Sequence, residues 1–220
     1  MQSRIRYLTL LLLPVMPLAY ASEDISKVNG SVEASAGQQY GDLETVNGGI
    51  TIGPGAQADD ASTVNGGITV GDRAQLRSLE TVNGAIRVGR GVKVANDIET
   101  VNGSVFTDSG SSVGGNVETV NGAIGVVRTQ VGGGIESVNG DVTVGIGSVV
   151  KGGITIEQST GWFQSSPKRI PRVVIGPDAV VEGPLVFKRD VHLHVHRSAR
   201  IGKVEGAEAR IYTSDTAPAD

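Results

Sequence analysis

The chain has 220 residues, a formal net charge of −4 at pH 7 and no Cys. This length suits one domain, and the lack of Cys excludes disulfides, thiol chemistry and a lipid-modified N-terminal Cys. The acidic balance argues against nonspecific nucleic-acid binding, because phosphate backbones attract basic surfaces.

Residues 1–21 predict a secretory signal peptide. Arg4 and Arg6 give a positive start, Leu8–Leu18 an apolar stretch, and Ala19–Ala21 a small-x-small cleavage site. The apolar stretch is too short for a membrane span, so no transmembrane segment is expected once the signal is removed. Removal takes away two Arg and lowers the formal net charge from −4 to 17 − 23 = −6. We therefore expect an exported protein, in the periplasm, on the cell surface or secreted.

A Val-Asn-Gly motif occurs seven times between residues 28 and 140, at steps of 18 or 19 residues. Its Asn and Gly residues are Asn29, Gly30, Asn47, Gly48, Asn65, Gly66, Asn83, Gly84, Asn102, Gly103, Asn121, Gly122, Asn139 and Gly140. A period held so closely predicts a repeat architecture in which each copy is one structural unit.

Apolar residues within each unit recur in pairs two residues apart, as in Ile50/Ile52 and Ala56/Ala58. Spacing of two is the strand period. A third apolar pair consists of the Val of the motif and the residue three positions before it, for example Val46 and Leu43. A spacing of three residues does not fit the strand period, so a bend is expected there. Three short strands per unit, without helical segments, predict an all-β fold. The predicted fold is a single-stranded parallel β-solenoid of about ten 18–19-residue coils over residues 22–212.

A series of hairpins is the alternative, because Asn-Gly is the strongest short hairpin signal. Independent hairpins would leave an unpaired edge in every unit, which favours the solenoid. In a solenoid the Asn-Gly pairs are structural corners: Gly is expected to supply positive φ, and the stacked Asn side chains to form an amide ladder.

The Val-Asn-Gly-x-Ile repeats resemble those of bacterial adhesin-like β-solenoids. The run Ile175-Gly-Pro-Asp-Ala-Val-Val-Glu-Gly183 resembles the coils of bactofilins, which are polymer-forming bacterial scaffolds. The resemblance covers roughly residues 25–205 and implies a β-solenoid with a structural role.

Two polar columns accompany the repeats. Thr recurs directly before the Val, and an outward Thr column would suit an ice-binding face; the alternative is that the hydroxyls bond to one another or to backbone at a bend. Glu recurs one residue earlier, as in Glu80 and Glu99, and could collect divalent cations or simply form a solvated face.

Regularity stops near residues 157–171, which predict an inserted loop. The loop contains Trp162 and Phe163. These aromatics predict either a partner-binding site or a cover for the flank of the solenoid.

The pattern then resumes for about two coils. His192, His194 and His196 alternate with apolar residues, so they share one strand face and are candidate metal ligands, the alternative being an outward solvated face. Residues 213–220 predict a disordered tail.

Together these features favour an exported structural or interaction protein, a rigid rod that acts as an envelope scaffold or adhesin-like surface. No enzymatic activity and no cofactor are expected, and the expected partners are copies of the chain itself or envelope components. The alternatives are a polysaccharide-binding or polysaccharide-cleaving β-helix, and a metal-binding or ice-binding face.

Overall fold

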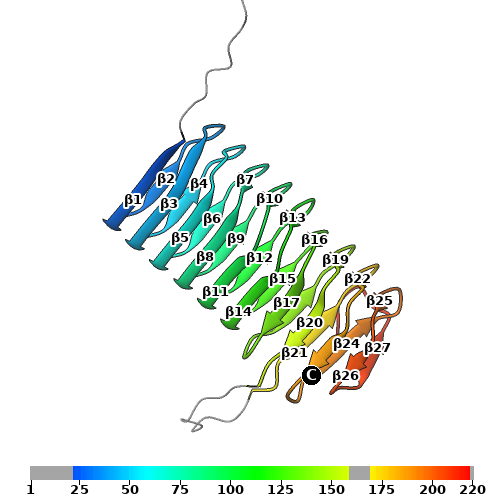
Figure 1. Cartoon of the computed structure of the whole chain (residues 1–220). Helices are drawn as coiled ribbons and strands as arrows, with labels where there is room; N and C mark the ends of the chain where they lie inside the picture. The colour runs from blue at the N-terminus through cyan, green and yellow to red at the C-terminus, as the bar shows by residue number, and fades with distance from the viewer. Residues whose placement is uncertain (1–21, 159–168, 219–220) are drawn as a thin grey trace, which may run out of the picture.

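The computed structural model describes residues 22–158 and 169–218. In these residues the chain winds through three parallel sheets, here called A, B and C, and forms a straight rod with β1 at one end and β27 at the other (Figure 1). The described residues contain no helix, and hence none that could cross a membrane.

The strands are short in every sheet. Sheet A contains β1 (Glu23–Asn29), β3 (Tyr40–Asn47), β5 (Asp60–Asn65), β8 (Ser78–Asn83), β11 (Ile98–Asn102), β14 (Val117–Asn121), β17 (Gly134–Ser137), β20 (Gly153–Ile156), β23 (Leu185–Phe187) and β26 (Val204–Glu205). Sheet B contains β2 (Val32–Ala34), β4 (Ile50–Ile52), β6 (Ile68–Val70), β9 (Ile86–Val88), β12 (Val105–Thr107), β15 (Ile124–Val126), β18 (Val142–Val144), β21 (Arg172–Ile175), β24 (His192–His196) and β27 (Ala209–Tyr212). Sheet C contains β7 (Gln75–Leu76), β10 (Lys93–Val94), β13 (Ser112–Val113), β16 (Gln130–Val131), β19 (Val149–Val150), β22 (Val180–Val181) and β25 (Arg200–Ile201).

Each residue pairs with its equivalent one coil later, as Ile50 does with Ile68 and Ile68 with Ile86. Inward Leu, Ile, Val and Ala side chains therefore stack into one continuous buried core along the rod. Sheets A and B have ten strands each, in agreement with the predicted solenoid of about ten coils. All the pairings are parallel, which rules out the hairpin alternative for the described residues.

The sequence-based assignment of the repeat Val to the core is wrong. In β8 the side chains alternate strictly, so Leu79 and Thr81 point inward while Glu80 and Val82 point outward. Thr81 is only 4% exposed, and its hydroxyl donates a 2.8 Å hydrogen bond to the carbonyl of Gly66 at the preceding corner. A Thr can occupy the core here because the corner carbonyl satisfies its hydroxyl.

The expected role of the corner Gly also needs correction. Gly48, Gly66, Gly84, Gly103 and Gly140 lack positive φ, whereas Gly30 (φ 102°) and Gly122 (φ 157°) have it. What these positions require is close approach between coils. A Cβ on Gly84 would lie 2.0 Å from the carbonyl oxygen of Gly66.

The insertion lies between β20 of sheet A and β21 of sheet B, where other coils carry the Val-Asn-Gly corner. No strand lies between Ile156 and Arg172 in the described residues, as predicted. Trp162 and Phe163 lie outside the described residues, so their predicted role in partner binding stays a prediction.

The chain after β27 passes back toward β21, where the guanidinium of Arg172 donates to the carbonyl of Pro218. The predicted disorder of residues 213–220 stays a prediction.

Candidate interaction groove on sheet A

The predicted amide ladder is present along the corner between sheets A and B. Each Asn donates through Nδ2 to Oδ1 of the preceding Asn, over 2.9–3.1 Å, from Asn139 back to Asn29. At the far end, Arg189 Nη1 donates to Asn139 Oδ1 and to the carbonyl of Val138. The Asn side chains of the motif therefore bond to one another from coil to coil.

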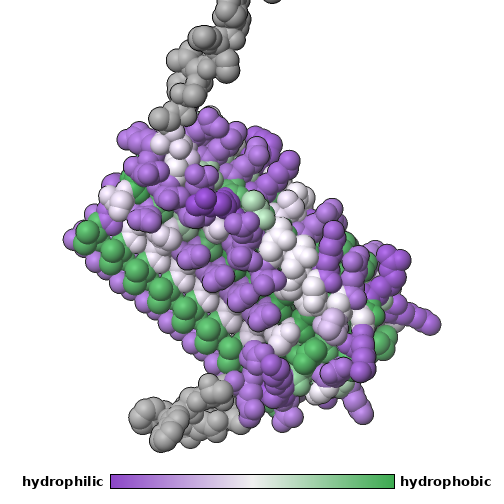
Figure 2. Space-filling model, in the orientation of Figure 1, coloured by the Kyte–Doolittle hydropathy of each residue, from purple (hydrophilic) through white to green (hydrophobic). Residues whose placement is uncertain are grey.

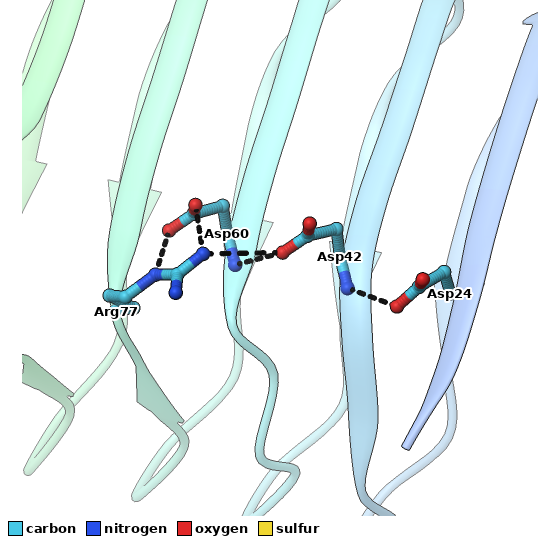
Figure 3. Close-up of polar contacts among 4 residues, drawn as sticks. All are labelled: Asp24, Asp42, Asp60 and Arg77. Carbon is cyan, nitrogen blue, oxygen red and sulfur yellow. Dashed lines mark hydrogen bonds and ion pairs between the residues drawn. The ribbon is translucent and has the colours of Figure 1, made fainter. Parts of the chain in front are cut away.

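A second ladder, which the sequence analysis missed, lies at the start of the sheet A strands. Asp24 Oδ1 accepts from the backbone NH of Asp42, and Asp42 Oδ1 from that of Asp60 (Figure 3). Arg77 then closes this part of the ladder by donating to both Asp60 and Asp42. Its hydrogen bond holds the pKa of Asp60 below the usual range. The signal was available, since Asp or Asn stands four residues before the Val in most copies.

The outward residues of sheet A form two parallel columns. The Val column consists of Val46, Val64, Val82, Val101 and Val120, each between 38% and 41% exposed. The Glu column consists of Glu44, Glu80, Glu99, Glu118 and Glu136, with Ser62 in place of Glu in one coil. In Figure 2 a row of hydrophobic surface follows the ends of the sheet A strands.

Between the columns lies an open groove of about 600 Å³ that extends from Ser26 to Glu157. Since its walls come from the same two positions of every coil, the groove repeats itself along the rod, with a step of about 4.8 Å between strands. One wall is acidic except at Ser26 and Ser62, and the other is apolar. Such a surface suits an elongated partner better than a compact one.

The acidic wall is poorly neutralised. Among the described residues, no ion pair involves the Glu column. At the two ends of the groove, Lys27 donates to the Ser31 carbonyl and Lys188 pairs with Glu157. Burial and repulsion from Glu118, Glu80 and Asp97 raise the pKa of Glu99. Burial and repulsion from Glu118 and Glu157 likewise raise the pKa of Glu136.

The Thr column lies beneath this groove rather than on an outward face. Thr45, Thr63, Thr100 and Thr119 repeat the geometry of Thr81, each donating to the carbonyl of a corner Gly. The ice-binding interpretation of the Thr column is therefore wrong, and the alternative of bonding to backbone at a bend is confirmed.

The three His residues lie on one face of β24, as predicted from their alternation. The expectation that all three face solvent is wrong for His194, which is 1% exposed. His196 Nδ1 accepts from the backbone NH of Ser198, and its ring packs edge-on against Tyr212. Within residues 22–158 and 169–218 no group of three or more His, Cys, Asp or Glu could hold a metal ion. Metal binding by His192, His194 and His196 stays a prediction.

Comparison of the chain with models of protein families, with curated proteins and with solved structures found no match. The resemblance to adhesin-like and bactofilin repeats therefore rests on the repeat residues alone, and the β-solenoid fold on the structure.

Proposed function

We propose that this protein is an exported, non-enzymatic structural or interaction protein that uses the groove on sheet A to contact an elongated partner. The observation that carries the proposal is the repetition of the same Glu and Val pair in successive coils of a rigid rod. A repeated surface suits a scaffold or adhesin-like role. A polysaccharide-cleaving enzyme would instead need convergent acids and bases in one cleft.

The C-terminal end of the rod supports a further partner, a second copy of the chain. Ile211 pairs with the buried Val195 and so occupies a core position, yet it is 63% exposed because no further strand pairs with β27 among the described residues. An open sheet end with apolar surface favours association with another sheet.

Cell fractionation combined with native size measurement tests both parts of the proposal. We expect the mature chain, processed after Ala21, outside the cytoplasm and larger than a monomer. A cytoplasmic, unprocessed chain would contradict export, and an exported monomer would contradict self-association.

A further inference from the structure

We propose that the groove on sheet A binds linear aliphatic polyamines, whose ammonium groups pair with the Glu column while their methylene groups lie against the Val column. The inference rests on the proposed use of this groove as an interaction surface. It adds a chemical class of ligand, and it can fail without affecting export or self-association of the rod.

The charge of the groove calls for a multivalent cation. Glu80, Glu99 and Glu118 stand in successive coils, and no ion pair is formed by them among the described residues. Carboxylates held about 4.8 Å apart repel one another. Burial, together with this repulsion, raises the pKa of Glu99. A ligand with several positive charges in a row would relieve the repulsion along the whole column.

The second wall selects for a ligand with an apolar backbone. Val82, Val101 and Val120 are exposed in the same coils as these Glu residues, two positions further along each strand. Hydrated metal ions gain nothing from this wall, because methyl groups offer them no ligands. A methylene chain, in contrast, loses contact with water when it lies along the column, which stabilises the complex.

The spacing of the coils agrees with that of a polyamine built from three-carbon links. Two nitrogens joined by an extended three-carbon link lie about 5 Å apart by ordinary bond lengths, close to the strand spacing of about 4.8 Å. Lys side chains on one face of an extended peptide recur only about every 6.6 Å and would fall out of step within a few coils. The polyamine therefore fits this groove better than a basic peptide does.

Isothermal titration of the mature protein with norspermine, a linear tetramine whose nitrogens are all joined by three-carbon links, tests the proposal at low salt. Saturable binding with a defined stoichiometry is expected. The variant Glu80→Gln/Glu99→Gln/Glu118→Gln should lower the affinity for the polyamine about tenfold or more. A matched control, Glu33→Gln/Glu182→Gln/Glu208→Gln, removes the same charge from exposed positions outside the groove. It should change the affinity for the polyamine by less than about twofold.

A second variant separates specific binding from general attraction of cations. Val82→Thr/Val101→Thr/Val120→Thr keeps the side-chain shape and the charge but makes the wall polar. It should weaken norspermine binding at least threefold while leaving Mg²⁺ uptake unchanged, with circular dichroism confirming that each variant folds. Equal loss in the groove and control Glu variants, or no effect of the Val variant, would mean that only the net charge attracts cations, and would overturn the proposal.

Discussion

Arg189 Nη1 donates a 2.8 Å hydrogen bond to Oδ1 of Asn139, the last amide of a ladder that begins at Asn29. Because every amide donates toward the N-terminal end, the ladder leaves an acceptor at its C-terminal end, and its dipoles align along the rod. A cation at the negative end of aligned dipoles is stabilising, as it is at the C-terminus of a helix. Arg189 thus caps the ladder where the Val-Asn-Gly corners end.

Replacing this cap should destabilise the rod. Arg189→Met removes donors to Asn139 Oδ1 and to the carbonyls of Val138 and Arg169, and should lower the free energy of unfolding by about 1–2 kcal/mol. Lys188→Met is the control, because it removes only an exposed ion pair with Glu157 and should cost under about 1 kcal/mol. Urea denaturation measures both. Equal effects of the two variants would show that the cap contributes no more than an ordinary surface charge.

Gly84 should be intolerant of a side chain although its φ is not positive. Gly84→Ala places a Cβ 2.0 Å from the Gly66 carbonyl oxygen, so two coils must move apart at a cost of about 1–3 kcal/mol or more. The control is Gly125→Ala in β15, where a Cβ would make ordinary contact with Phe106 at 3.4 Å. We expect thermal unfolding to show a lower melting temperature for Gly84→Ala and little change for Gly125→Ala. The reverse order would contradict the close-approach explanation.

The Glu column should make stability depend on pH. Burial and the neighbouring carboxylates raise the pKa of Glu99 above its ordinary value in the folded rod, so near these pKa values the folded state binds more protons than the unfolded chain does. Stability from this group is therefore greatest below the unfolded pKa and is lost as pH rises through the folded pKa. Glu99→Gln should accordingly melt at a higher temperature than the parent chain at pH 7, and the difference should shrink toward pH 4.5 and in high salt. A variant that melts lower at every pH would contradict this expectation.

Removal of one complete coil should preserve the fold. Deleting Asp97–Gly115 removes β11, β12 and β13 and brings β14 into register with β8, because both strands pair with β11 at equivalent residues. Deleting only Asp97–Val105, nine residues, shifts inward and outward positions out of phase, at a cost on the order of 1–3 kcal/mol for each buried polar group. Circular dichroism and native size should show a shorter folded rod in the first case and aggregation in the second. A folded nine-residue deletion would contradict the strict register.

The architecture could be predicted because one coil cannot bury its own apolar residues. Pairs such as Ile50/Ile52, repeated at steps of 18 or 19 residues, leave stacking on the next copy as the way to cover them. The same stacking brings Asn65 onto Asn47, so the amide ladder followed from the period alone. The ladder of Asp24, Asp42 and Asp60 could have been predicted in the same way, because these residues recur with the same period.

Other features depended on contacts between coils that apolar periodicity does not describe. Thr81 is buried and Val82 exposed because the partner of the Thr hydroxyl, the Gly66 carbonyl, lies in the preceding coil. The groove exists because Val82, and not Thr81, faces outward beside Glu80. Arg189 reaches Asn139 across 50 residues of chain, and no spacing rule connects them. The sequence period alone therefore determined which residues stack, whereas the satisfaction of polar groups between coils decided which side chains face the core and which form the surface.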